Sequence, residues 1–195
     1  MSLLPHIVDK IVKTSLEASE VMRAWMESVN DHINSRSKFG FIDYNDTSTS
    51  ASPILLVADE WTDIPNDGLG AFTNKLYTPE GVSELLDTST GYLDFSDIAL
   101  GSEIIVRNDF TVTPGTNNAL LEARYLLGVG AGEYALQFWS ERLDNGSGIG
   151  YQRVTSFPIY MGDTNTQSNP AKLQIKLSTT GTVVNAGVYI SIRSD

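Results

Sequence analysis

One run of residues limits the fold of this chain more than any other. In residues 102–113, SEIIVRNDFTVT, apolar side chains stand on one face at Ile104, Val106, Phe110 and Val112. Successive side chains of a β-strand point to opposite faces, so this alternation predicts a long strand with one face in a core. The opposite face is polar except at Ile105, which we therefore expect to contact a neighbouring subunit.

Similar runs follow one another from Ile54 onward, separated by Gly, Asn and Pro. They span residues 54–59, 91–96, 102–113, 119–128, 134–143, 150–161, 172–179 and 187–194. About eight strands with no alternating helices exclude a βαβ architecture. The pattern predicts a mainly β fold, a jelly-roll β-sandwich over residues 54–195.

Two of these runs carry apolar side chains on both faces. In ALLEARYLLG, Leu120 and Leu126 lie opposite the main apolar set. In YALQFWSERL, an inward set that ends at Phe138 leaves Trp139 and Leu143 outside. Because a monomer would expose these side chains, we expect an oligomer to bury Leu120, Leu126 and Trp139.

Residues 1–35 predict a long α-helix with the spacing of a coiled coil. Apolar or small residues alternate at steps of four and three, at Leu4, Val8, Ile11, Ser15, Ala18, Met22, Trp25 and Val29. Ile7, Val12, Leu16, Val21, Met26 and Ile33 widen this seam beyond what a two-stranded coiled coil covers. A third strand or a surface of another protein would cover the extra width, and packing on the chain's own domain is the alternative. The expected contact residues are Val8, Ile11, Met22, Trp25 and Val29.

Residues 36–53 join the predicted helix to the predicted sandwich. They are rich in Ser, Thr, Asp and Asn and show no periodicity, which predicts a linker or an extended arm. Phe39, Phe41, Ile42 and Tyr44 are too apolar for a free linker, so we expect them to lie against a partner. Removal of residues 1–45 should then leave the sandwich intact.

The charge distribution excludes some partners. The net charge is −11, and all of the excess lies in residues 39–109, which hold two basic and thirteen acidic side chains. Such a surface repels phosphate, so we expect no nucleic-acid binding. No run approaches the roughly 18 apolar residues of a membrane helix, and charges interrupt the first twenty residues, so we expect neither a membrane span nor a targeting segment.

The chain offers little that could carry catalysis. It has no cysteine, and its two histidines, His6 and His32, both lie in the predicted helix. Asp94 and Asp97 flank a turn, where aspartate caps backbone groups. The Gly-rich stretches at 128–134 and 143–152 have no following helix and are interpreted as hairpin turns. We expect no enzyme activity and no cofactor.

Two binding hypotheses remain open from the residues alone. Six acidic residues between Asp43 and Asp67 offer oxygen ligands for calcium, but no twelve-residue calcium loop is present. Exposed aromatic rings at Trp61, Trp139 and Tyr160 would stack on sugars, with core or interface packing as the alternative.

The order of motifs resembles one group of proteins. The resemblance rests on Trp61, Tyr77, Thr90-Gly91-Tyr92-Leu93-Asp94-Phe95, Leu100-Gly101-Ser102, Val106-Arg107-Asn108-Asp109-Phe110, Thr113-Pro114 and Asn117-Asn118. Together with the helix and the arm, this order of motifs resembles that of trimeric phage virion proteins. These are head-decoration or cement proteins, head fibres, and tail-fibre knobs with sandwiches of the tumour-necrosis-factor and C1q type.

The resemblance implies a function. It implies a homotrimeric, non-enzymatic structural protein of a bacteriophage virion, on the capsid surface or tail, that contacts the major capsid protein or other virion proteins through its N-terminal helix and arm. The alternative is a tail-fibre knob that binds a receptor or a host-surface glycan. It implies no catalytic residues.

Overall fold

The computed structural model describes residues 17–29, 39–145 and 148–194. By its internal contacts the chain divides into two units, Met1–Ser37 and Lys38–Asp195. Within the first unit, residues 17–29 are α-helical, as predicted. The predicted contact residues Val8 and Ile11, and both histidines, lie outside the described residues. No described helix is long and apolar enough to cross a membrane.

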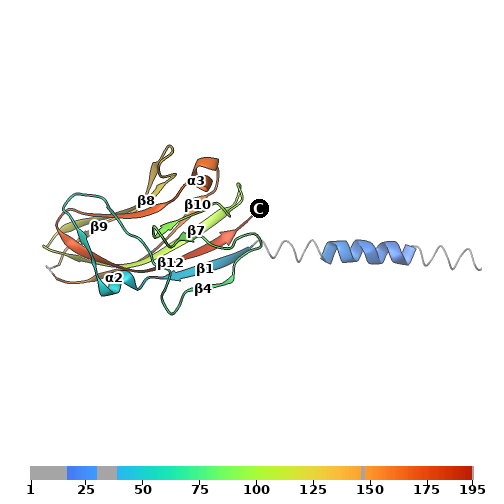
Figure 1. The fold of residues 1–195 in the computed structure, drawn as a ribbon, viewed down its shortest axis with the longest axis horizontal. Coiled ribbons are helices and arrows are strands. Elements are labelled where there is room, and N and C mark those ends of the chain that lie inside the picture. Colours follow the sequence, from blue (N-terminus) through green and yellow to red (C-terminus); the bar gives the residue numbers. More distant parts are fainter. Residues whose placement is uncertain (1–16, 30–38, 146–147, 195) are drawn as a thin grey trace, which may run out of the picture. The chain divides into compact units, whose positions relative to one another are not determined.

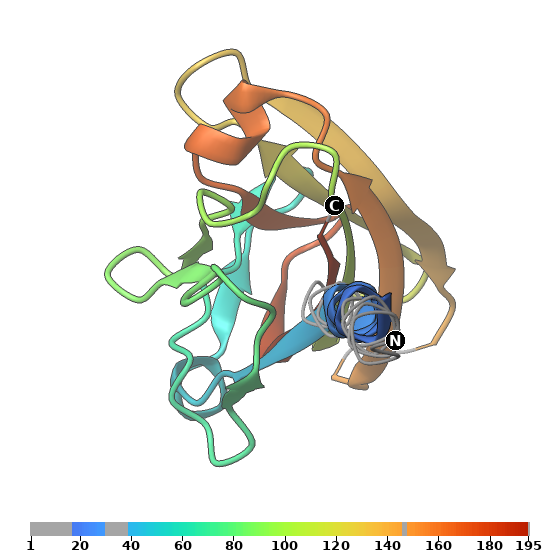
Figure 2. The ribbon, with the colours of Figure 1, turned by 90° about the vertical axis from the view of Figure 1, so that its right-hand side faces the viewer.

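The second unit is built from antiparallel sheets (Figures 1 and 2). The six-stranded sheet has the order β10-β7-β12-β1-β4, with β2 also paired to β12. Its strands are β1 (Phe39–Asn45), β2 (Ile54–Leu56), β4 (Asn74–Tyr77), β7 (Glu103–Pro114), β10 (Tyr151–Tyr160) and β12 (Gly181–Arg193). The four-stranded sheet, β3-β11-β8-β9, contains β3 (Thr62–Asp63), β8 (Ala119–Leu127), β9 (Tyr134–Leu143) and β11 (Lys172–Leu177). A small ribbon of β5 (Leu86–Asp87) and β6 (Tyr92–Leu93), and the short helices α2 (Ser48–Ala51) and α3 (Thr164–Ser168), complete the unit.

The pairing of the principal strands is that of a jelly roll. β1 pairs with β12, β3 with β11, β7 with β10, and β8 with β9, all antiparallel. Eight strands taken in chain order therefore pair first with last, second with seventh, third with sixth and fourth with fifth. This nested pairing forms two Greek keys and confirms the predicted fold. The Gly-rich stretch after β8 is a hairpin, as predicted, whereas the one after β9 leads into the other sheet.

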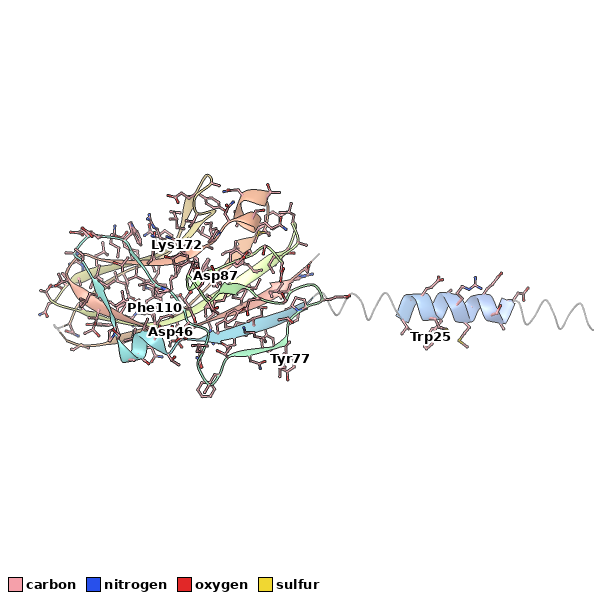
Figure 3. All side chains as sticks on the ribbon, in the orientation of Figure 1. Trp25, Asp46, Tyr77, Asp87, Phe110 and Lys172 are labelled. Carbon is pink, nitrogen blue, oxygen red and sulfur yellow. The ribbon has the colours of Figure 1, made fainter. Side chains whose placement is uncertain are left out.

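The core lies between the two sheets. In β7 the even-numbered residues from Ile104 to Pro114 are buried, and the odd-numbered ones are exposed or half-buried. β12 alternates in the same way from Val188 to Ile192. Phe110 is fully buried within this layer (Figure 3). The alternation predicted for β7 is confirmed.

The predicted arm is wrong for residues 39–51. Phe39–Asn45 is strand β1, which lies between β12 and β4 and pairs with β12 at seven positions. Its Ile42 and Tyr44 are fully buried, so this short alternation contributes to the core although polar residues follow it. Helix α2 follows directly, and the Asp46 carboxylate accepts a hydrogen bond from the Thr49 backbone N–H at 2.9 Å.

The predicted outward placement of Trp139 and Leu143 is also wrong. Leu143 is buried, and Trp139 packs against the core. The reason is a bulge in β9, because the register pairs Ala123 with Trp139 but Arg124 with Gln137. The extra residue, Phe138, lets consecutive side chains of β9 both contact the core.

Candidate interaction surfaces

The N-terminal helix exposes a row of apolar side chains. We call the set Ala18, Val21, Met22, Trp25, Met26 and Val29 the helix stripe. Val21, Met22, Trp25 and Met26 are 70%, 57%, 61% and 58% exposed, and Val29 is half-buried. Trp25 projects from the helix in Figure 3. The predicted contact residues Met22 and Trp25 thus lie on an apolar face that nothing within residues 17–29 covers, which is the condition for a docking surface.

A second apolar surface lies on the outer face of the six-stranded sheet. Strand pairing places Pro158 of β10, Ile105 of β7, Ser191 of β12, Phe41 of β1 and Tyr77 of β4 in one row across the sheet. Ile105 is 43% exposed. This row is apolar except at Ser191, and Ile105 lies between Pro158 and Ser191 in it.

Neighbouring rows extend this apolar area. We call the complete set the sheet surface: Phe39, Phe41, Tyr77, Ile105, Val154, Pro158, Tyr160 and Tyr189. Tyr160 and Phe39 are 68% and 61% exposed. The Phe41 ring stacks on that of Tyr77, with 5.1 Å between centroids, and lies 5.4 Å from that of Tyr189. These mutual contacts hold large rings on a solvent-facing sheet, as at protein interfaces.

A hollow of about 320 Å³ adjoins the sheet surface. Its lining includes Asp43, Arg107, Asp109, Tyr189 and the exposed ring of Phe72. Partial burial raises the pKa of the Asp43 carboxyl, and the Arg107 guanidinium opposes that shift. Arg107 also lies over the Tyr189 ring, 5.1 Å from its centroid. Two carboxylates, one cation and two rings thus meet beside the sheet surface.

The outer face of the four-stranded sheet has a different character. Leu120 is exposed and Leu126 half-buried, but Glu122 and Arg124 stand between them on β8. Glu122 pairs with Lys176 at 2.6 Å, and Arg124 donates to Gln174 at 2.8 Å. The structure therefore places Leu120 and Leu126 on the opposite sheet from Ile105, separated by polar pairs. That they contact a neighbouring subunit stays a prediction.

The Trp61 ring is covered by cations. The Arg124 guanidinium lies 4.0 Å and the Lys176 ammonium 4.8 Å from its centroid. Both cations are held in place by β8 and β11 partners, so this ring is engaged within the chain. Of the rings considered for sugar stacking, Trp139 contacts the core and Tyr160 is the one left exposed.

Most clustered carboxylates bind the backbone of turns. Asp97 accepts from the Ser83 backbone N–H at 2.9 Å, and Asp94 from that of Ser96 at 2.9 Å. The hydrogen bonds from Ser83 hold the pKa of Asp97 below its usual value. In residues 17–29, 39–145 and 148–194, no three His, Cys, Asp or Glu side chains are grouped as a metal site.

Sequence reasoning identified Ile105, Phe39 and Phe41 but missed the rest of the sheet surface. In β10, Val154, Pro158 and Tyr160 occupy alternate exposed positions. That spacing predicts a second apolar face for the run 150–161. The sequence does not predict that these residues lie close to Ile105, because that proximity depends on the pairing of β10 with β7.

Comparisons with known proteins return similar folds only. No family model and no curated protein matches the chain. A structure of the Eiger TNF from S. frugiperda is similar with 8% identity and a TM-score of 0.45, over 80% of this chain and 93% of that one. The CBM22-1 xylan-binding domain of Paenibacillus barcinonensis Xyn10C is similar with 10% identity and a TM-score of 0.42, over 80% of this chain and 97% of that one. A structure of infectious bursal disease virus, Gt strain, is similar with 14% identity and a TM-score of 0.35, over 49% of this chain and 24% of that one. At such values no function of those proteins passes to this chain.

Proposed function

We propose that this chain is a non-enzymatic structural protein of a bacteriophage virion, a homotrimeric capsid decoration or head-fibre protein anchored through its N-terminal segment. The sheet surface is the observation that carries the proposal. It gathers exposed large apolar side chains on one face of the six-stranded sheet of a chain with a net charge of −11, and it includes Ile105, Phe39 and Phe41, which the sequence alone predicted as contact residues.

Burial of the sheet surface would stabilise an assembly. A fully buried large apolar side chain contributes about 1.5–3 kcal/mol, and five members of this surface are exposed large apolar side chains, namely Phe39, Tyr77, Ile105, Val154 and Tyr160. Such a sum offsets the ordering costs of association. The acidic remainder of the sandwich stays in water, which suits a protein displayed on a particle.

The test is incorporation into particles. Virions of the phage that encodes this chain are purified, and each virion should contain the chain in a multiple of three copies. Ile105→Glu places a charge in the apolar row of the sheet surface and should abolish trimers and reduce occupancy at least about tenfold. Thr88→Glu, at an exposed position in the β5–β6 turn, is the matched control and should leave both unchanged.

Absence of the protein from virions would refute the virion role. Full occupancy by the Ile105→Glu variant would refute the role of the sheet surface.

A receptor- or glycan-binding knob is the second candidate, and one observation favours it. The hollow beside the sheet surface combines aromatic rings, Phe72 and Tyr189, with hydrogen-bonding groups of Asp43, Arg107 and Asp109. Small-ligand sites combine apolar walls with a few polar groups in this way. Glycan-array binding that Asp109→Asn removes, while trimers persist, would favour this candidate over a purely structural role.

A further inference from the structure

The helix stripe has a width that selects its partner. In the heptad phase set by the spacing of the sequence, Met22 and Val29 are a positions and Ala18 and Trp25 are d positions. Val21 then falls at g and Met26 at e, both exposed. In a two-stranded coiled coil, e and g positions border water and usually carry charges. Ser19 and Ser28 occupy the other e and g positions of this segment. Val21 and Met26 thus extend the stripe beyond the seam that one neighbouring helix covers.

The charges of the same helix lie away from the stripe. Glu17, Glu20, Arg23 and Glu27 fall at positions b, c and f. No charge at e or g repels a second copy or selects a different partner, although such charges set partner choice in other coiled coils. Residues 1–38 hold five basic and five acidic side chains, so copies of this segment carry no net charge toward one another.

We infer that the helix stripe is covered by the stripes of two further copies of this chain, in a parallel three-stranded coiled coil. Two neighbours per helix cover the e and g positions that one neighbour leaves exposed. Because the N-terminal segment has no net charge, its own charge does not oppose the approach of a further copy. The parallel orientation rests on the proposed homotrimer, because three sandwiches joined to the same end of their helices can then assemble with one another.

The charged face distinguishes this occupant from a membrane surface. Helices that lie on membranes carry Lys and Arg on the polar face and are drawn to anionic lipids. In residues 17–29 the polar face carries three glutamates and one arginine. The inferred occupant is therefore protein, and its chemistry is that of the stripe itself.

Single cysteines test the inference in the full-length protein, because the chain contains none of its own. Ala18→Cys places a thiol at a d position, where identical residues of parallel, in-register helices meet at distances that a disulfide can span. Arg23→Cys places one at a b position of the same helix and is the matched control. Mild oxidation of dilute protein should cross-link the Ala18→Cys variant at least about tenfold faster than the control. Sedimentation of the reduced protein should give the mass of three protomers.

Each other outcome shows which of the proposals is wrong. Equal cross-linking of the two variants in a protein with a three-protomer mass would show that the helices do not meet along the stripe, and would leave the proposed trimer standing. Rapid cross-linking with a two-protomer mass would refute the three-stranded bundle. A monomer that does not cross-link would refute both the coiled coil and the proposed trimer. Absence from virions, with cross-linked trimers in solution, would refute the virion role alone.

Discussion

Gly187 shows how a single residue shapes the sheet surface. It follows a bulge at which β12 shifts register against β7 between Asn185 and Gly187. Its φ of 148° is one that residues with a side chain rarely adopt, and a Cβ there would lie 2.3 Å from the Tyr44 backbone oxygen. Glycine is therefore required for β12 to pass β1 at this point. The same residue lines the hollow beside the sheet surface.

Replacement of Gly187 by alanine should be costly. Gly187→Ala combines the backbone strain with a clash against a backbone atom, so we expect the free energy of unfolding to fall by about 2–4 kcal/mol. Gly130→Ala is the matched control, because Gly130 also has a positive φ, of 92°, but a Cβ there meets nothing within 4 Å. Its cost should be about 1 kcal/mol. Urea denaturation followed by circular dichroism measures both, and equal losses would contradict the close approach.

One side chain of the two-residue strand β3 joins it to both β11 and β6. The Asp63 carboxylate accepts hydrogen bonds from Gln174 at 2.7 Å, Lys172 at 2.9 Å and Tyr92 at 3.1 Å. Burial by itself would raise the pKa of Asp63, but these hydrogen bonds outweigh it and hold the pKa below the usual 3.8. The hydrogen bond to Asp63 raises the pKa of Lys172 above 10.5. Both groups are thus charged over a wide range of pH.

The pKa shifts of Asp63 and Lys172 define the pH range in which this pair stabilises the fold. A lowered carboxyl pKa stabilises the fold above about 3.8, and the gain is lost as pH falls through the folded value. A raised lysine pKa stabilises below about 10.5, and the gain is lost as pH rises through the folded value. The pair therefore contributes fully between about pH 5 and 9.

Asp63→Asn should cost about 1–2 kcal/mol at pH 7, because it removes a charge-assisted hydrogen-bond acceptor. The difference from the unmodified protein should shrink toward pH 3. Glu133→Gln, in the exposed turn after β8, should have no effect. Denaturation series between pH 3 and 7 measure both variants. A loss at pH 7 that persists undiminished at pH 3 would contradict the role of the Asp63 charge.

At the scale of elements, the sequence predicted what alternation alone determines. β7 alternates without interruption, and its inward face was predicted correctly. β9 was not, because the bulge at Phe138 changes which positions face inward and arises from pairing with β8. β1 was missed because Ile42 and Tyr44 are too few to outweigh the polar residues that follow. The sheet surface is assembled from separate strands, so its extent follows from strand order, which no single run contains.

For the whole molecule, the core lies entirely in the second unit. The buried apolar residues described by the structure run from Ile42 to Ile192, and none comes from residues 17–29. Removal of residues 1–37 should therefore leave a cooperatively folding sandwich, with Tm lowered by less than about 4 °C. Thermal unfolding by circular dichroism measures this.

A deletion that continues into β1 is the control. Removal of residues 1–51 also removes Ile42 and Tyr44 from between β12 and β4, so it should prevent cooperative folding. This outcome is contrary to the expectation from the sequence that residues 1–45 are dispensable. A fully folded product would contradict the assignment of β1 to the core sheet.

The nested pairing of the first and last strands also decides where foreign sequence can be attached. Phe39 pairs with Arg193, so the chain enters and leaves the sandwich at the same end (Figure 1). The turn at residues 115–118 follows Pro114, at the opposite end of β7 from Glu103, which pairs with Arg193. A peptide fused to the C-terminus would emerge at the end of the sandwich where β1 begins. An epitope intended for display at the other end of the sandwich belongs in the turn at residues 115–118.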